Sequence, residues 1–299
     1  MSPVLDGFSL NDKTWMNFLV EYIEPLRLDD SAYDDLVLEQ DQKELILSFA
    51  RQQETHVKEM NDIISGKGEG LVVLLSGPPG TGKTLTAEAV ADKVGRPIYH
   101  IDTHELASDR LSSQLRSIMN VAAEWDAIVL LDEADVFLQK RRADNMTRNE
   151  HVATFLRELE YYWGTLFLTT NLLDSIDEAV ESRIQLHIVF KRLDAAARKA
   201  VWGNLLKRNG YYGSSVSALD VEDLSLWSLN GRQIKNVLQM TTKYCSRNGA
   251  PLGLETIEKT IRLTSPKAAK SNRKVATSTW IERSKPNDTG GDQIDSEQS

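Results

Sequence analysis

The segment at residues 77–84 has the residue types and spacing that bind a triphosphate. It reads Gly-Pro-Pro-Gly-Thr-Gly-Lys-Thr, a complete Walker A motif, between an apolar run and a helical pattern. Glycines let backbone N–H groups turn toward phosphate oxygens, and the following helix N-terminus adds partial positive charge. We expect Lys83 to contact the β- and γ-phosphates and the Thr84 hydroxyl to ligate Mg²⁺. The predicted ATP-binding residues are Gly77, Pro78, Pro79, Gly80, Thr81, Gly82, Lys83, Thr84, Leu85 and Asp132.

Two carboxylates follow a second apolar run, at residues 128–131. This is the Walker B arrangement, in which a buried strand delivers Asp132 to the Mg²⁺ ion, so that the predicted metal ligands are Thr84 and Asp132. Glu133 is expected to orient and deprotonate the attacking water, which indicates hydrolysis rather than binding alone. Asn171 ends a further apolar run. Because parallel strands end at the same edge of a sheet, its amide should lie near the γ-phosphate and hold that water.

The elements that must position these groups alternate along the chain. Short apolar runs with strand character occur at residues 71–75, 97–101, 127–131, 166–170 and 185–189, with helical patterns between them. Such alternation predicts an α/β fold with a parallel sheet covered on both faces. After Lys191 the strand patterns stop. Three helical patterns then predict a small all-helical domain.

The two ends of the chain give different signals. Apolar residues recur at helical spacing near the N-terminus and predict a helix packed on the main domain: Trp15, Phe18, Leu19, Tyr22 and Ile23. From residue 265 the chain is polar and is predicted to be disordered, although Trp280 and Ile281 could dock. The predicted division is an N-terminal helical or linker segment at 1–38, a core at 39–190, a helical lid at 191–264 and a tail at 265–299.

Composition argues against several classes of function. A formal charge of −9 opposes broad nucleic-acid binding, which needs a basic surface, but it leaves a local basic patch open. The single cysteine, Cys245, cannot form an internal disulfide, and the histidines show no metal-ligand spacing with it, so no metal besides Mg²⁺ is expected. The sequence has no signal-peptide pattern and no apolar stretch that could span a membrane. We therefore expect a soluble, intracellular chain, with its compartment open.

Several motifs together resemble those of one family. Besides the two Walker motifs and Asn171, the segments at 177–184 and 230–234 resemble AAA+ ATPases, and the resemblance covers about residues 62–261. Within that superfamily, three stretches resemble a group of largely uncharacterised, mostly fungal AAA proteins, whose longer members carry extra domains ahead of this region: 131–138, 159–162 and 230–236.

The resemblance implies a P-loop NTPase three-layer fold with a five-stranded parallel sheet and a helical lid. It implies ATP bound between neighbouring subunits of a ring, usually a hexamer. Arg183 matches the arginine finger that reaches the neighbour's γ-phosphate, although a local pair with Glu181 is the alternative. Arg232 matches the second sensor, and residues 62–64 lie where relatives wrap the adenine. The predicted catalytic residues are therefore Glu133, Lys83, Asn171, Arg183 and Arg232.

The sequence also departs from the family pattern. Residues 104–110 match a pore loop but lack the aromatic residue with which many relatives grip peptides, and only one arginine stands at the finger segment. The basic run at 139–142 could line a pore, touch a phosphate backbone or be solvated. The favoured function is an oligomeric ATPase that remodels an unknown protein substrate, and the main alternative is a slow ATP-dependent switch or scaffold. A nucleic-acid motor and a small-molecule kinase are less favoured.

Overall fold

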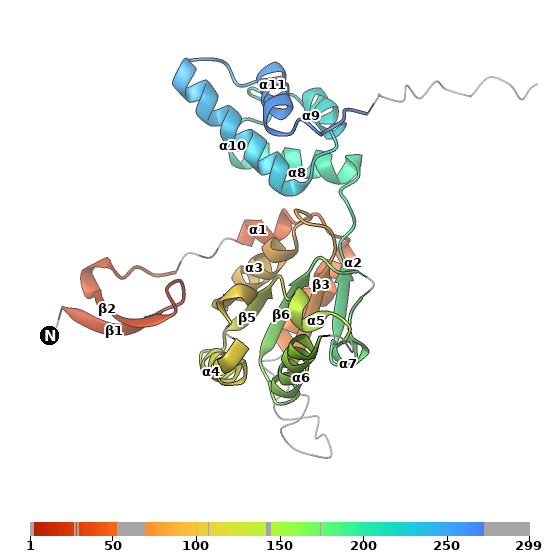
Figure 1. Cartoon of the computed structure of the whole chain (residues 1–299). Coiled ribbons are helices and arrows are strands. Elements are labelled where there is room, and N and C mark those ends of the chain that lie inside the picture. Colours follow the sequence, from red (N-terminus) through yellow and green to blue (C-terminus); the bar gives the residue numbers. More distant parts are fainter. Residues whose placement is uncertain are drawn as a thin grey trace, which may run out of the picture.

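The computed structural model describes residues 3–26, 28, 30–52, 70–106, 108–141, 145–173 and 175–271. Along the chain, a β-hairpin precedes an α/β domain, and a group of helices follows it (Figure 1). None of the helices in these ranges is both long and apolar enough to cross a membrane.

The α/β domain is built on a five-stranded sheet in which every paired strand is parallel. Its order is β4-β5-β6-β3-β7. The strands are β3 (Leu71–Ser76), β4 (Ile98–Asp102), β5 (Ile128–Asp132), β6 (Thr165–Thr170) and β7 (Leu186–Val189). All residues of β3 and β6 are buried, as expected for central strands covered on both faces. This confirms the predicted P-loop NTPase α/β fold with its five-stranded parallel sheet.

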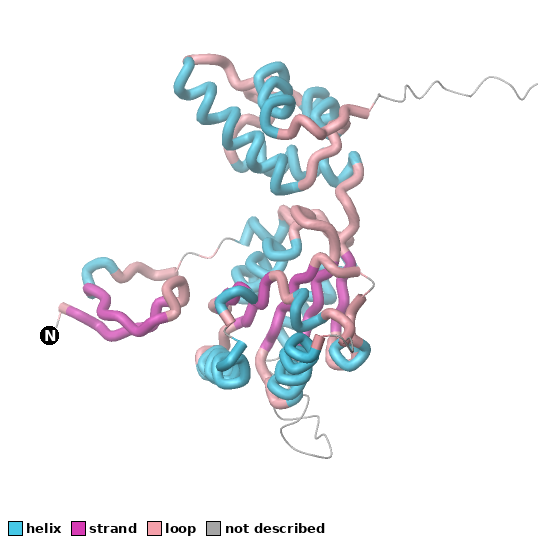
Figure 2. The backbone as a smooth tube through the Cα atoms, in the orientation of Figure 1, coloured by secondary structure: helices cyan, strands magenta, loops and turns pink. Residues whose placement is uncertain are grey.

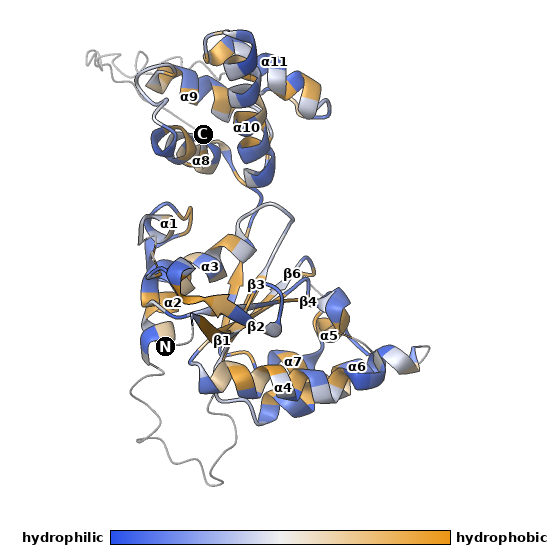
Figure 3. Ribbon diagram, turned by 90° about the vertical axis from the view of Figure 1, so that its left-hand side faces the viewer, coloured by the Kyte–Doolittle hydropathy of each residue, from blue (hydrophilic) through white to orange (hydrophobic). Residues whose placement is uncertain are grey.

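Two layers of helices cover the sheet, one on each face (Figures 1 and 2). The helices and their bounds are α1 (Asp30–Asp34), α2 (Gln40–Gln52), α3 (Lys83–Val94), α4 (Leu111–Glu124), α5 (Asp135–Leu138), α6 (Met146–Glu160) and α7 (Glu178–Glu181). One apolar cluster joins the sheet to α2 and α3, and it includes Ile46, Leu75 and Ala87. The other joins the opposite face to α4 and α6, through residues such as Leu115 and Phe155. Figure 3 shows these apolar faces turned toward the sheet.

The strand register brings polar strand ends to one edge of the sheet. Ser76 pairs with Thr170, and Asp102 pairs with Asp132, so these four residues end their strands at the same edge. Crossover connections in a parallel sheet place the following loops there as well. The edge therefore collects the loops that carry the candidate functional residues.

A separate helical unit, the lid, follows β7. Its helices are α8 (Ala195–Arg208), α9 (Ala218–Ser225), α10 (Gly231–Asn248) and α11 (Leu254–Thr264), which is one more than the sequence patterns indicated. They pack around their own apolar core, including Trp202, Leu206, Val237 and Ile257. Figure 1 shows the lid standing over the loop edge of the sheet. The lid can therefore fold around its own core while facing the candidate site.

The predicted N-terminal helix is wrong. Residues there form an antiparallel hairpin of β1 (Val4–Ser9) and β2 (Thr14–Leu19), followed by a short 3₁₀ helix, η1 (Val20–Tyr22). Phe8 and Trp15 both contact Trp125: the ring centroid of Phe8 lies 5.1 Å from that of Trp125, and the ring centroid of Trp15 lies 6.2 Å from it. Trp125 follows α4 and is over a hundred positions away in the chain. This stabilising contact therefore cannot be inferred from the spacing of apolar residues within the N-terminal segment.

The tail predicted from residue 265 also begins too early. The Ser228 N–H donates to the Ala269 carbonyl at 2.9 Å, and the Ser271 N–H donates to the Leu226 carbonyl at 3.0 Å. The Lys270 ammonium also pairs with Glu258 at 2.6 Å. Residues 265–271 are thus fastened to the lid by hydrogen bonds that composition does not reveal. The rest of that prediction, with Trp280 and Ile281, lies outside the described residues.

Candidate active site

The phosphate loop joins β3 to α3 and depends on glycine at two close approaches. Gly77 has φ of 143°, and a Cβ there would overlap the carbonyl oxygen of Phe190. Gly80 has φ of 74°, and a Cβ there would lie 2.6 Å from the side chain of Asn230, at the start of α10. Only glycine meets both the backbone angle and the lack of space at these positions. The loop is therefore curled, with the lid helix α10 directly against it.

Lys83, the first residue of α3, points back into this loop. Its ammonium donates to the carbonyl oxygens of Gly77 at 2.7 Å and Pro78 at 3.0 Å, and to Oδ1 of Asn171 at 3.0 Å. Burial lowers the pKa of Lys83, and the nearby carboxylates of Asp132 and Asp135 only partly oppose that shift. The structure thus brings the Walker A lysine and the β6-end asparagine together, and a bound phosphate would add the negative charge that favours the ammonium.

Thr84 and Asp132 meet at the adjacent position. The Thr84 hydroxyl lies 3.1 Å from each carboxylate oxygen of Asp132. A hydroxyl oxygen and a carboxylate are the hard oxygen donors that Mg²⁺ takes alongside phosphate oxygens and water. These two residues therefore fit a magnesium ion, as the Walker motifs predict, and they could hold it beside the phosphate loop.

Glu133 is held in an unusual backbone conformation. Its φ is 53°, which is left-handed and uncommon for a residue other than glycine. Its N–H donates to the Thr169 hydroxyl at 3.0 Å, and its carbonyl accepts a 2.9 Å hydrogen bond from the Thr103 hydroxyl. The Thr169 hydroxyl also donates to the carboxylate of Asp132. Two threonines thus fix the peptide groups on either side of the Glu133 Cα and leave its carboxylate exposed.

The two threonines and Asp135 are residues that the sequence reasoning missed. Asp135 accepts hydrogen bonds from the Asn171 N–H at 3.2 Å and from the Thr170 hydroxyl, so it fixes the end of β6. The sequence did offer a signal for these three residues. Each carries a hydroxyl or carboxylate at or just beyond the C-terminal end of a strand, and residues in that position lie at the functional edge of a parallel sheet.

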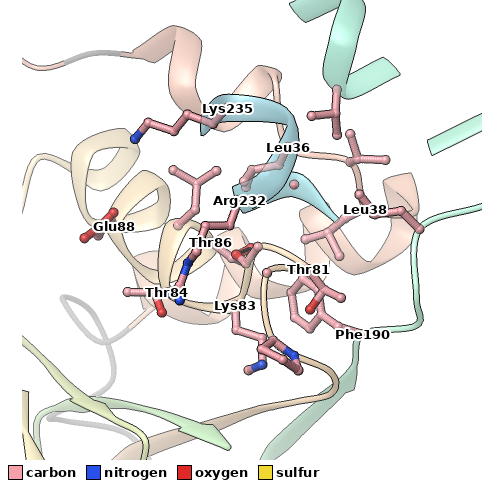
Figure 4. A pocket seen from close by; sticks show the side chains of 18 of the residues that line it. Leu36, Leu38, Thr81, Lys83, Thr84, Thr86, Glu88, Phe190, Arg232 and Lys235 are labelled. Carbon is pink, nitrogen blue, oxygen red and sulfur yellow. Dashed lines mark hydrogen bonds between the residues drawn. The ribbon is translucent and has the colours of Figure 1, made fainter. Parts of the chain in front are cut away.

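A cavity of about 370 Å³ lies between the sheet edge and the lid. At the phosphate loop it is lined by Lys83, Thr84, Asp132, Glu133 and Asn171, and Arg232 extends from α10 toward Thr84 (Figure 4). Apolar side chains line it as well, from the α1–α2 loop, from the end of β7 and from α8: Leu36, Val37, Leu38, Phe190, Leu193, Val201 and Leu205. The cavity thus combines charged groups with an apolar wall suited to a flat ring.

The predicted adenine contacts at residues 62–64 lie outside the described residues. Residues 36–38 form part of the apolar wall, and the sequence reasoning missed them too. Their signal was a Leu-Val-Leu triplet that stands between acidic residues just ahead of a helix.

Residues 73–192 match the family model described as "ATPase family associated with various cellular activities (AAA)". The chain contains an AAA ATPase-family domain. One of the curated proteins similar to the chain has this family in its name. The "ATPase family AAA domain-containing protein FIGL1" of Arabidopsis thaliana is 27% identical over 210 residues, which are 65% of this chain and 30% of that protein.

Two further relatives extend this comparison. The "ATP-dependent zinc metalloprotease FtsH" of Lachnoclostridium phytofermentans is 31% identical over 182 residues, 56% of this chain and 31% of that protein. The human "Fidgetin-like protein 1" is 29% identical over 159 residues, 49% of this chain and 24% of that protein. The chain spans under a third of the length of each of these three relatives. The similarity therefore covers only part of each of those proteins.

Arg183 stands apart from the other candidate residues of the AAA domain. It follows α7, is half-buried and donates to the Ala179 carbonyl at 2.9 Å. It is not among the residues that line the cavity. The start of the same short helix is fixed by Asp177, which caps it and pairs with Arg141 at 2.9 Å. That pairing gives one residue of the basic run at 139–142 a local structural role.

Proposed function

We propose that this AAA domain binds Mg-ATP in the cavity and hydrolyses it to ADP and phosphate. The observation that carries the proposal is the convergence of Lys83, Thr84, Asp132, Glu133 and Asn171 at one edge of the sheet. A buried ammonium, a hydroxyl–carboxylate pair, an exposed carboxylate and an amide are the groups that phosphoryl transfer to water requires.

Each side chain has a role that follows from its position. Lys83 stabilises negative charge on the transferred phosphoryl group, and Asn171 orients the attacking water. Glu133 accepts a proton from that water on its carboxylate. Bound Mg²⁺, held by Thr84 and Asp132, would supply further charge neutralisation on the phosphate oxygens. Arg232, which projects into the same cavity, is proposed to contact the phosphates of its own subunit.

The proposed working form is a homo-oligomeric ring, with a hexamer as the expected size, that remodels a protein or protein complex. Arg183 lies outside the cavity of its own subunit, as a side chain that serves a neighbouring site would. The acidic charge of −9 opposes a nucleic-acid substrate. Membership of the mostly fungal AAA group, indicated by residues 131–138, 159–162 and 230–236, is part of this proposal.

A slow ATP-dependent switch or scaffold is the second candidate. The segment expected to form a pore loop contains two short 3₁₀ helices, η3 (Thr103–Glu105) and η4 (Ser108–Arg110), without an aromatic side chain. Glu105 is also paired with Lys13 of the N-terminal hairpin. A segment tied to the hairpin in this way has less freedom to grip and pull a peptide.

The proposal is tested by ATP turnover and by nucleotide titration of the purified chain. Glu133→Gln should bind ATP as the wild type does but hydrolyse it about 10²–10⁴-fold more slowly, since a general base contributes that much. The matched control is Glu124→Gln, an exposed carboxylate at the end of α4. Wild-type turnover in Glu133→Gln would remove Glu133 from its role.

The oligomeric part needs a separate measurement. Turnover per subunit should rise with protein concentration, and Arg183→Ala should lower it by up to about 10³-fold without weakening ATP binding. Arg247→Ala, an exposed arginine near the end of α10, is the control. Turnover that is independent of concentration and of Arg183 would favour a monomeric enzyme.

A further inference from the structure

The lid contacts the α/β domain through polar side chains of α8. The Asn204 side-chain amide donates to the backbone carbonyl of Asp35 at 2.9 Å. One turn further along α8, the Arg208 guanidinium donates to the Ser31 hydroxyl at 2.7 Å and lies 3.5 Å from the Asp35 carboxylate. These contacts join α8 to α1 and to the residue that follows it.

The contacts lie in the wall of the cavity. Asp35, Asn204 and Arg208 are themselves lining residues. Leu36 follows Asp35 in the chain and Leu205 follows Asn204, and both leucines contribute to the apolar wall. The two sides of that wall are therefore linked by the same polar contacts, and α8 cannot swing away from α1 without breaking them.

A different contact holds the lid near the phosphate loop. The Gly231 N–H donates to the Gly80 carbonyl at 2.8 Å, and both residues line the cavity. The lid is thus attached at the phosphate loop through the start of α10 and at the apolar wall through α8. If the contact at Gly80 persists while α8 separates from α1, the lid opens on the side of the apolar wall.

We propose that Asn204 and Arg208 form a latch with Ser31 and Asp35 that sets how long a nucleotide stays bound. This inference rests on the proposed function, because it takes the apolar wall as the binding place of the nucleotide base. Asn204 and Arg208 are positioning residues: they hold the wall closed and take no part in the phosphoryl transfer. Opening of the latch precedes release of ADP.

The strength of the latch comes from its hydrogen bonds more than from its charges. The Arg208 and Asp35 side chains are 43% and 38% exposed, so solvent and salt screen their attraction. The two hydrogen bonds, to the Asp35 carbonyl and to the Ser31 hydroxyl, add a directional component that salt screens less. Raising the salt concentration should therefore speed release only modestly in the wild type.

The test is the release rate of fluorescently labelled ADP, measured by displacement with excess unlabelled nucleotide in a stopped-flow instrument. The full chain carrying Asn204→Ala and Arg208→Ala should release the labelled ADP about tenfold faster than wild type, as expected for loss of two hydrogen bonds and a screened ion pair. Its association rate should change much less. The salt dependence of release should also become weaker without Arg208, leaving the part that comes from the phosphate contacts of Lys83 and Arg232; a general loosening of the fold would not produce this change.

Two further variants make the result specific. Lys199→Ala breaks a 2.6 Å ion pair with Glu222 that lies within the lid, so it should leave the release rate unchanged. Ser31→Ala removes one hydroxyl from an exposed position and should fold normally, while release becomes about two- to threefold faster. Wild-type release rates in both Ser31→Ala and the double variant would overturn the latch. Failure of the wild-type chain to bind the labelled ADP would overturn the proposed function, and the latch with it.

Discussion

Replacing Thr169 with valine removes two hydrogen bonds that position Glu133 and Asp132 and leaves both carboxylates in the chain. The Thr169 hydroxyl accepts from the Glu133 N–H at 3.0 Å and donates to the Asp132 carboxylate. Valine has nearly the same shape, so the substitution removes the two hydrogen bonds without opening a cavity. Thr169 is 1% exposed, so water cannot readily take the place of the hydroxyl.

The cost of Thr169→Val follows from these partners. A buried N–H left without an acceptor costs about 1–3 kcal/mol. The Asp132 side chain is 23% exposed, so water can partly replace the lost donor and that loss is about 1 kcal/mol. We therefore expect the free energy of unfolding to fall by about 2–4 kcal/mol.

The same substitution should slow hydrolysis. A left-handed backbone costs about 1–2 kcal/mol for a residue with a side chain, so Glu133 keeps φ of 53° only while its neighbours hold it. Once one hydrogen bond is gone, the carboxylate is free to shift. A displacement of about 1 Å can lower a rate 10²-fold, so we expect turnover to fall by roughly 10- to 100-fold.

Thr165→Val provides the matched control for the assay. Thr165 is also buried on β6, where its hydroxyl accepts from Arg96 at 3.0 Å, but it lies at the opposite end of the strand. Urea unfolding should show a stability loss for both variants, whereas ATP turnover at saturating substrate should drop only for Thr169→Val. Equal turnover in the two variants, at a temperature where both are folded, would refute the positioning argument.

Three other substitutions address different parts of the molecule. Lys83→Ala should abolish ATP binding in a fluorescence titration, and an unchanged affinity would contradict the Walker A assignment. Arg141→Ala should cost about 1–3 kcal/mol in urea unfolding, because it leaves the buried Asp177 without its guanidinium. Burial opposes ionisation of Asp177, but hydrogen bonds from Arg141 and from backbone N–H groups lower its pKa overall. That stabilisation is therefore present above the ordinary carboxyl pKa of about 4, and the cost of Arg141→Ala should shrink as the pH falls below it. Phe8→Ala should weaken the attachment of the hairpin to Trp125, which Trp15 also contacts, and make the hairpin more sensitive to limited proteolysis; a wild-type cleavage pattern would show that the Phe8 ring contact is dispensable.

Much of the sheet and of its functional edge follows from local sequence. The apolar runs that became β3, β5 and β6 are buried on both faces, and each leads into a residue type that serves the edge. Since parallel strands must end together, Lys83, Asp132 and Asn171 could be placed near one another without a structure. Physical constraints on parallel sheets make this part of the fold predictable.

Features that depend on contacts between distant residues were not predictable in the same way. The apolar residues of β2 fit a helical period as well as a strand, and only the contact with Trp125 decides between them. The threonine that supports Glu133 from the η3 segment, Thr103, is separated from it by α4 and β5. The apolar wall at Leu36 is completed by α8 of the lid, which follows the α/β domain in the chain.

The order in which the cavity is synthesised has its own consequence. Its lining runs along the chain from Ala32 to Lys235. At about 5–20 residues per second, a ribosome completes the phosphate loop roughly 8–30 s before it completes the start of α10. A ligand of this cavity can therefore stabilise only a chain that has been synthesised past the start of α10. A product interrupted before the lid would gain no protection from cellular nucleotide, and it would be exposed to the proteases that remove incomplete chains.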